Sequence, residues 1–244
     1  MDGKKVILSL KNTGLFYKRR TGFLRHDKFW ALRDVSFDLY HGETLGIIGK
    51  NGVGKSTLLR MIAGIMDPDR GEVIRHESLR ASLLALQVGF IPHLTGRQNA
   101  ILSGLLLGLC RADVEVLLPR IFEFSELGDF IDQPVRSYST GMKARLGFSV
   151  ALYVDPDILL IDEVLGVGDV DFRNKSADAI REITKSDKTV VIVSHNNELI
   201  RSLCDRVVWI ENGHTQGVGS ADAITKQYQQ RHTSVAAREM TNSG

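Results

Sequence analysis

The order of apolar and polar positions predicts strands that alternate with helices along most of the chain. Residues 45–48, 158–161 and 189–193 form short, almost wholly apolar runs, which are typical of strands buried on both faces of a sheet. Residues 58–63 repeat apolar side chains at helical spacing, and a second helix is expected near 172–185. The pattern therefore predicts an α/β fold.

Further strands are expected where β-branched and aromatic residues alternate with polar ones. A hairpin is indicated near the C-terminal end, because Glu211-Asn212-Gly213 is a turn sequence between two strand-like segments. These additional strands cover residues 6–10, 35–39, 72–74, 81–86, 206–210 and 214–218.

Residues from about 99 to 154 have helical periodicities, and we interpret them as a helical subdomain inserted into the α/β core. The core with its insertion is expected to span residues 1–220. Residues 221–228 suggest a short helix that opens a C-terminal tail, and the last dozen residues up to 244 are polar and expected to be frayed.

Composition narrows the classes of protein that fit this fold. The 244 residues are 43% hydrophobic and carry a net charge of +2. The chain as a whole therefore has no strong positive field that would attract nucleic acid. Cys110 and Cys204 lie far apart in apolar segments and are expected to be reduced core residues of a cytoplasmic protein. We expect no secretory signal, because the first residues lack the apolar stretch of one. The apolar run 100–110 is about half the length of a membrane-spanning helix.

A glycine-rich loop between the strand at 45–48 and the helix at 58–63 has the features of a phosphate-binding loop. Its glycines allow successive N–H groups to face an anion at the positive end of a helix. Lys55 adds a charge for the outer phosphates, and the Ser56 hydroxyl can ligate Mg²⁺. The alternative is an ordinary glycine-rich turn. The loop comprises Gly49, Lys50, Asn51, Gly52, Val53, Gly54, Lys55, Ser56 and Thr57.

Two acids and a histidine follow buried strands that should end at the same edge of the sheet. Asp162 and Glu163 come directly after 158–161, and His195 follows 189–193. Asp162 is suited to holding Mg²⁺ through water, and Glu163 to orienting or deprotonating an attacking water. His195 could contact a γ-phosphate. In the alternative interpretation, these side chains only cap helices.

A second candidate anion site opens a helix inside the insertion. Ser139 stands where an N-cap belongs, and Thr140 and Gly141 allow a close approach of backbone to ligand. Met142 follows them. Small polar residues cap many helices, so an ordinary cap is the alternative.

Residues 16–30 mix aromatic side chains with a local surplus of positive charge. We expect Tyr17 to stack on a nucleotide base, because the face of an aromatic ring beside cations suits a purine triphosphate. A second interpretation packs the aromatics under a solvated basic loop. A third directs the basic residues toward anionic lipid headgroups.

Taken together in this order, the motifs resemble the ATP-binding cassette of ABC transporters over about residues 5–220. In that resemblance, the glycine-rich loop is the Walker A motif, and residues 158–163 are Walker B. Ser139, Thr140, Gly141 and Met142 occupy the signature position, residues 166–169 with Asp169 form the D-loop, and His195 is the switch histidine. The fold implied is that of a P-loop NTPase with an antiparallel β subdomain and a helical subdomain.

Within this family, residues 89–99, 138–145 and 162–169 are similar to the cassettes of bacterial O-antigen and related polysaccharide exporters, including those for capsule and teichoic acid. Some of these cassettes continue into a carbohydrate-binding domain, and we expect none here. An ABC transporter for a different substrate is the alternative.

Two departures from the family pattern stand out. The signature usually reads Leu-Ser-Gly-Gly-Gln, whereas Tyr138, Thr140 and Met142 stand here in place of its leucine, first glycine and glutamine. The glutamine of the Q-loop, a further metal ligand, corresponds to Gln87 only if the alignment is shifted.

The resemblance also implies partners and cofactors. It predicts a head-to-tail homodimer that encloses two molecules of ATP with Mg²⁺, each between the phosphate loop of one copy and the signature of the other. It further predicts a separate membrane permease that docks between Gln87 and about Leu107. The dimer would lie at the cytoplasmic face of the bacterial inner membrane.

Overall fold

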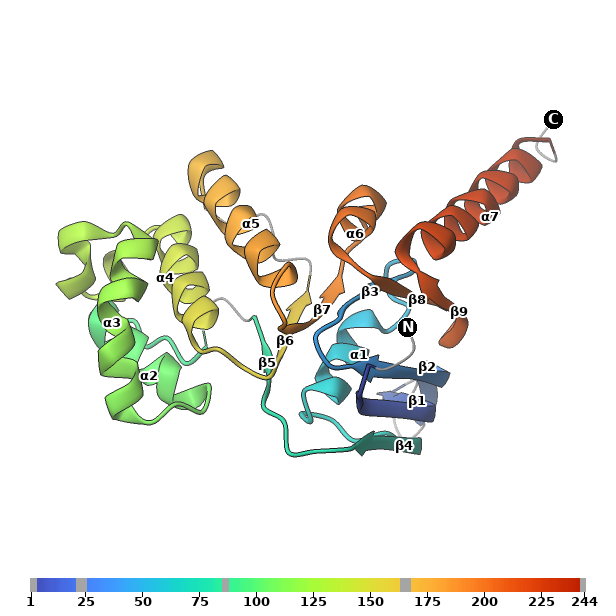
Figure 1. Cartoon of the computed structure of the whole chain (residues 1–244), viewed down its shortest axis with the longest axis horizontal. Coiled ribbons are helices and arrows are strands. Elements are labelled where there is room, and N and C mark those ends of the chain that lie inside the picture. The colour runs from blue at the N-terminus through green and yellow to red at the C-terminus, as the bar shows by residue number, and fades with distance from the viewer. Residues whose placement is uncertain (1–3, 21–25, 85–87, 163–167, 242–244) are drawn as a thin grey trace. The chain divides into compact units, whose positions relative to one another are not determined.

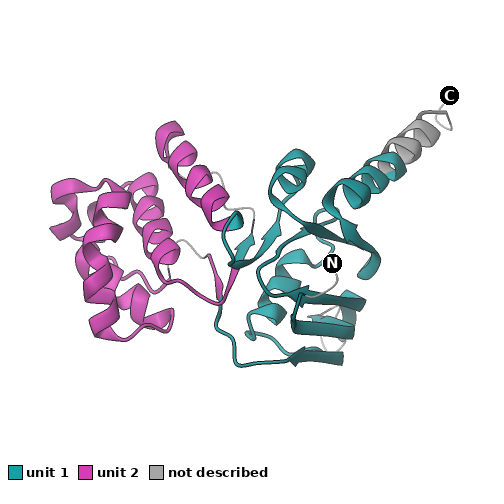
Figure 2. Cartoon of the chain, in the orientation of Figure 1, with its two compact units in different colours: residues 1–81, 160–163, 184–244 teal, residues 82–159, 164–183 magenta. Residues whose placement is uncertain are grey.

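The computed structural model describes residues 4–20, 26–84, 88–162 and 168–241, and Figure 1 shows their strands and helices. The chain divides into two compact units, coloured separately in Figure 2. Unit 1 comprises Met1–Ala81, Leu160–Glu163 and Thr184–Gly244, and unit 2 comprises Ser82–Leu159 and Val164–Ile183.

The centre of unit 1 is a parallel set of strands that the sequence pattern predicted. Strand β3 (Thr44–Ile48) is buried at every position and pairs in parallel with β7 (Thr189–Val193) and β8 (Arg206–Glu211). Their Val- and Ile-rich runs bury side chains on both faces, as parallel strands require. The order of strands in the sheet is β4 (Arg70–Arg75), β1 (Val6–Arg20), β2 (His26–Tyr40), β9 (His214–Ser220), β8, β3, β7, β6 (Ile158–Asp162) and β5 (Ala81–Leu83).

Three further strands, β6, β5 and β9, can be compared with the strands expected from the sequence. Strand β6 (Ile158–Asp162) confirms the run expected at 158–161. Strand β5 (Ala81–Leu83) confirms the first part of the strand expected at 81–86, whose residues 85 and 86 lie outside the described residues. Strand β9 (His214–Ser220) pairs antiparallel with β8. Asn212 and Gly213 turn the chain with φ of 53° and 78°, as a tight hairpin turn demands. The predicted hairpin is confirmed.

The antiparallel part of unit 1 is larger than expected. Strands β1 (Val6–Arg20) and β2 (His26–Tyr40) form a long hairpin, and β4 (Arg70–Arg75) pairs with β1 (Figure 1). The sequence predicted strands only at 6–10 and 35–39, and the interpretation of 16–30 as a basic loop is wrong for its described residues. Aromatic side chains favour strands and pair across them, as the rings of Phe16 and Trp30 do at 5.2 Å.

Two helices of unit 1 follow buried strands. Helix α1 (Lys55–Ile62) follows the glycine-rich loop and buries Leu58, Leu59, Met61 and Ile62. Helix α6 (Asn197–Leu203) follows β7, and the Asn196 side chain accepts hydrogen bonds from the N–H groups of Glu198 and Leu199. Each helix thus begins close to the carboxyl end of a parallel strand.

The C-terminal helix is longer than the short helix expected at 221–228. Helix α7 runs from Ala221 to Thr241, so the expectation of a frayed last dozen is wrong for the backbone up to Thr241. The helix is anchored on β8, because Tyr228 packs edge-on against Trp209 at 5.6 Å and Arg231 forms an ion pair with Glu211 at 3.3 Å. Burial raises the pKa of Tyr228 above its usual value.

Unit 2 is mainly helical. The sequence predicted a helical region from about residue 99, whereas helix α2 already begins at Gly96. The helix starts there because Thr95 and Gln98 form a reciprocal capping box. A buried cluster including Ala100, Val114 and Leu146 joins the helices. The helical segments are α2 (Gly96–Leu106), α3 (Arg111–Ser125), the short turns Gly128–Asp132 and Val135–Ser137, α4 (Thr140–Tyr153) and α5 (Val170–Thr184).

Both cysteines are free, but only one is a core residue. Cys204 is buried, and desolvation raises the pKa of its thiol to about 12. Cys110 is exposed at the start of α3, so its expected place in the core is wrong. Among the described helices, none is long and apolar enough to cross a membrane.

Candidate functional site

The glycine-rich loop connects β3 to α1 in the conformation that its glycines permit. Gly54 precedes α1 with φ of 93°, and a Cβ there would lie 2.7 Å from the carbonyl oxygen of Ala31. A Cβ on Gly49 would collide with the carbonyl oxygen of Ile210. The loop therefore needs glycine at both positions, and α1 directs its N-terminal N–H groups toward the loop.

Lys55 is the buried cation of this loop. Its side-chain ammonium donates hydrogen bonds to the carbonyl oxygens of Gly49 at 2.9 Å and Lys50 at 3.1 Å, and the residue is only 6% exposed. The loop thus holds the ammonium group before any phosphate binds. A bound phosphate would attract the ammonium by charge as well as by hydrogen bonding.

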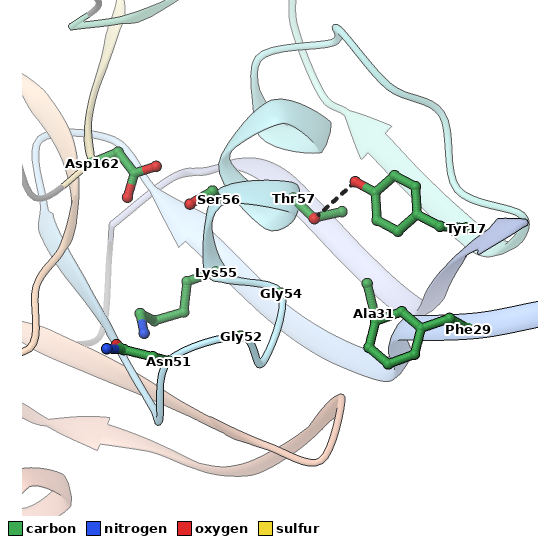
Figure 3. A pocket seen from close by; sticks show the side chains of 10 residues that line it. All are labelled: Tyr17, Phe29, Ala31, Asn51, Gly52, Gly54, Lys55, Ser56, Thr57 and Asp162. Atoms are coloured by element: carbon green, nitrogen blue, oxygen red, sulfur yellow. Dashed lines mark hydrogen bonds between the residues drawn. The ribbon is translucent and has the colours of Figure 1, made fainter. Parts of the chain in front are cut away.

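A cavity of about 510 Å³ lies over the loop in unit 1. Figure 3 shows aromatic residues beyond one end of the loop, and Asp162 with Ser56 toward the other. A cavity of this size is within the usual range for a small-molecule site. The residues that line it are Tyr17, Phe29, Ala31, Asn51, Gly52, Gly54, Lys55, Ser56, Thr57 and Asp162. Most of the residues predicted for the phosphate loop thus lie together.

The aromatic end of the cavity is built by two strands. Tyr17 on β1 lies directly opposite Phe29 on β2, and the two side chains are 39% and 55% exposed. The Tyr17 hydroxyl lies 3.1 Å from Oγ1 of Thr57, which fixes the direction of the ring (Figure 3). The prediction that Tyr17 stacks on a base stays a prediction, and its setting suits that role. Sequence reasoning missed Phe29, because only the hairpin register places it beside Tyr17.

Two of the three side chains predicted to hold Mg²⁺ line the cavity. The Ser56 hydroxyl and the Asp162 carboxylate both line it. This pair of oxygen donors suits Mg²⁺, which prefers oxygen ligands and keeps several waters or phosphate oxygens of its own. Gln87, the third predicted ligand, lies outside the described residues, as does the predicted base Glu163.

His195 stands where the sequence placed it, directly beyond the carboxyl end of β7. It is exposed and is not among the residues that line the cavity over the loop. Its neighbour Ser194 is buried, and the Ser194 hydroxyl accepts a hydrogen bond from the N–H of Asn196 at 3.1 Å. Because β7 runs parallel to β3, His195 and the phosphate loop share one edge of the sheet.

A second pocket lies within unit 2 and includes the predicted signature residues. The Ser139 hydroxyl accepts a hydrogen bond from the Met142 N–H at 3.1 Å, which confirms the predicted N-cap of α4. At Gly141 an added Cβ would meet only Ser139 Oγ, 3.7 Å away. The pocket has a volume of about 270 Å³ and is lined by Glu126, Leu127, Phe130, Ser139, Gly141, Met142, Arg145 and Asp169. Thr140, the first residue of α4, is exposed and is not among them.

Arg145 connects this pocket to the predicted D-loop residue. Its guanidinium donates to Asp169 at 2.8 Å and lies over the Phe172 ring at 5.1 Å. Asp169 also accepts the Phe172 N–H at 3.0 Å. The Phe172 hydrogen bond and the Arg145 charge hold the pKa of the Asp169 carboxyl below its usual value. Sequence reasoning missed Arg145, although its spacing of four from Gly141 on a helix gave a signal.

Many of the predicted residues thus line two pockets, one in each unit. Residues 32–166, which include the phosphate loop, the signature and Asp162, match the ABC transporter family. The chain belongs to that family. It is an ATPase of the ABC class, and its nucleotide-binding fold is the one that the sequence predicted.

The chain is also similar to particular members. It is 50% identical to the O-antigen export system ATP-binding protein RfbB of Klebsiella pneumoniae, over 87% of this chain and 86% of that protein. It is 44% identical to the teichoic acids export ATP-binding protein TagH of Listeria monocytogenes serotype 4b (strain F2365), over 89% of this chain and 64% of TagH.

Solved structures show the same fold. A dimeric ATP-binding cassette in a post-hydrolysis state, bound to ADP and phosphate, has a TM-score of 0.71 at 24% identity and covers 88% of this chain and 99% of that one. An ATP-binding subunit of an ABC transporter has a TM-score of 0.72 at 23% identity and covers 91% and 93%.

Proposed function

We propose that this chain hydrolyses ATP to power export of a lipid-linked polysaccharide of the O-antigen type through a separate membrane permease. The observation that carries the proposal is the 50% identity to the O-antigen export protein RfbB, which extends over most of both chains. The 44% identity to TagH supports export of teichoic acid as the second candidate. A capsule or an unrelated substrate is a further alternative.

The two pockets support a head-to-tail homodimer as the working form. The pocket over the phosphate loop offers the loop N–H groups and Lys55 to a triphosphate. The signature pocket offers the N-terminus of α4 beside Gly141, where an added Cβ would meet only Ser139 Oγ at 3.7 Å. In a two-fold pair, each copy would supply the first pocket to one nucleotide and the second pocket to the other. ATP would then stabilise the closed pair, and hydrolysis would release it.

Each predicted residue has a task in this proposal. Lys55 would exchange its carbonyl partners for phosphate oxygens, and Ser56 and Asp162 would hold Mg²⁺, which neutralises phosphate charge when it is bound. Glu163 would orient or deprotonate the attacking water, and His195 would contact the γ-phosphate. Arg145 holds Asp169 at 2.8 Å, so Asp169 would transmit conformational changes of the signature pocket to the partner copy.

The permease is proposed to dock on unit 2 between Gln87 and about Leu107. The described part of this segment includes α2, where Leu105 and Leu106 are 41% and 57% exposed. Exposed apolar residues on one helix suit a protein partner.

We propose that the chain divides into a domain over 1–220, a helical subdomain over about 99–154, and a tail from 221. The complex would lie at the cytoplasmic face of the bacterial inner membrane.

Deletion of this protein from its host cell tests the transported substrate. We expect a lipid-linked glycan to accumulate in the cytoplasm and the matching surface glycan to disappear. Wild-type protein should restore export and co-purify with the permease, whereas Lys55→Ala should co-purify without restoring export. Accumulation of a teichoic acid precursor would favour the second candidate. Unchanged surface glycans would contradict both.

A further inference from the structure

The distal part of the β1–β2 hairpin is a two-stranded ribbon, which we call the basic ribbon and define as residues 16–20 and 26–30. Strand β4 pairs with β1 only between Leu8 and Gly14, and β9 pairs with β2 only at Asp34. Within the described strands, the basic ribbon therefore pairs only with itself. A two-stranded ribbon alone is only marginally stable. Residues that weaken the pairing of its strands therefore call for a functional explanation.

The two faces of the basic ribbon carry different side chains, because successive residues of a strand alternate between faces. Tyr17 and Phe29 are on the face that lines the nucleotide cavity. The opposite face carries the Phe16–Trp30 pair and, next along the strands, the Lys18–Lys28 pair. The lysine side chains therefore lie on the face of the ribbon that is opposite the nucleotide site, so the two lysines can be substituted without changing the residues that line that site.

The lysine pair is an electrostatic conflict. Lys18 lies directly opposite Lys28, and both side chains are exposed. Like charges directly opposite each other destabilise a strand pair. Neither ammonium group forms an ion pair with another residue that the structure describes. Lys28 Nζ lies 4.3 Å above the centre of the Phe16 ring, so an aromatic platform holds this charge at the surface.

Basic residues outnumber acidic ones within the basic ribbon, although the two are nearly balanced over the whole chain. The sequence of the ribbon contains Lys18, Arg19, Arg20 and Lys28 with a single acid, Asp27, while the whole chain carries a net charge of only +2. Arg19 pairs with Asp27 on the Tyr17–Phe29 face, so the opposite face presents Lys18 and Lys28 without an acid among the described residues of the ribbon. A net charge of +2 does not give the broad positive field that attracts nucleic acid. A narrow basic patch backed by Trp and Phe is instead suited to the headgroup region of a membrane, where aromatic rings and lysines are favoured.

We propose that the Lys18–Lys28 face of the basic ribbon binds the anionic headgroups of a phospholipid membrane. Anionic headgroups would remove the repulsion between the two lysines and would leave the Tyr17–Phe29 face to the nucleotide. The contact would orient the nucleotide-binding unit toward the membrane by a surface other than the permease-docking segment. It does not depend on which substrate is exported, or on dimer formation.

Sedimentation of the full-length protein with vesicles tests this contact. Vesicles of phosphatidylcholine with phosphatidylglycerol should bind the protein, and vesicles of phosphatidylcholine alone should not. Each lysine near an anionic surface contributes about 1 kcal/mol, so Lys18→Ala/Lys28→Ala should weaken binding roughly 30-fold and Lys18→Ala alone about fivefold. Added salt should weaken wild-type binding.

Matched controls separate this contact from general charge and from misfolding. Lys185→Ala/Lys226→Ala removes two exposed lysines of the same unit and should bind vesicles like the wild type. All variants should retain ATP affinity, which shows that the hairpin remains folded. The proposal is overturned if the ribbon variant binds anionic vesicles like the wild type, or if both vesicle types bind equally. Binding to a single-stranded oligonucleotide without binding to vesicles would also overturn it.

Discussion

Glu163→Gln is expected to bind ATP normally, to remain as a closed dimer, and to release phosphate about a thousandfold more slowly than the wild type. A neutral amide cannot take a proton from the attacking water, whereas the phosphate loop and its cation are unchanged. The measurement combines phosphate release with the molecular mass in the presence of MgATP. The ATP-bound mass should be that of two copies, because the step that opens the dimer is blocked.

The control for this variant is Glu198→Gln. Glu198 is an exposed acid in the first turn of α6, so the change removes the same charge from the same unit without touching the cavity over the loop. It should hydrolyse ATP like the wild type. Phosphate release by Glu163→Gln at the wild-type rate would refute its role as the base.

Gly141→Asp is expected to lower ATP hydrolysis by at least about a hundredfold while each copy still binds one nucleotide. Inside the protein, a Cβ at this position meets only Ser139 Oγ at 3.7 Å, so the side chain fits without disturbing α4. A carboxylate at the signature would, however, occupy the place of the phosphate and repel it. Removal of electrostatic stabilisation at a reacting phosphate costs rate by factors of this order.

The comparison for Gly141→Asp uses Gln133→Glu, which adds one negative charge to an exposed position of the same unit. This control should retain the wild-type rate. Nucleotide affinity, measured on dilute protein by fluorescence, should be unchanged in both variants. A large loss of affinity in Gly141→Asp alone would place the signature within the nucleotide site of its own copy, contrary to the proposal.

The sequence predicted those parts of the fold that are determined by local patterns. The buried strand β3, the phosphate loop and helix α1 follow one another in sequence, so glycine spacing and an apolar run were sufficient to place them. The cap at Ser139 was likewise local. Asp162 followed from the rule that parallel strands present their functional residues at their carboxyl ends.

Features that depend on register or tertiary contact were not predictable in the same way. A solvated basic loop was one of the interpretations of residues 16–30, because their charges conceal the alternation of a strand. Phe29 enters the site only through its pairing with Tyr17. Helix α7 was expected to be short because its sequence is polar, yet Trp209 and Tyr228 anchor it at 5.6 Å. Arg145 acquires its partner Asp169 from another element of unit 2.

The central claim is that each reactive pocket is completed by a second copy, and mixing two inactive variants tests it most directly. Lys55→Ala lacks the cation of the phosphate loop, and Gly141→Asp lacks a working signature. Each should be inactive alone. If copies pair at random, half of the pairs are mixed and each has one intact pocket, so the mixture should recover about a quarter of the wild-type ATPase rate. A mixture no more active than its components would contradict the account.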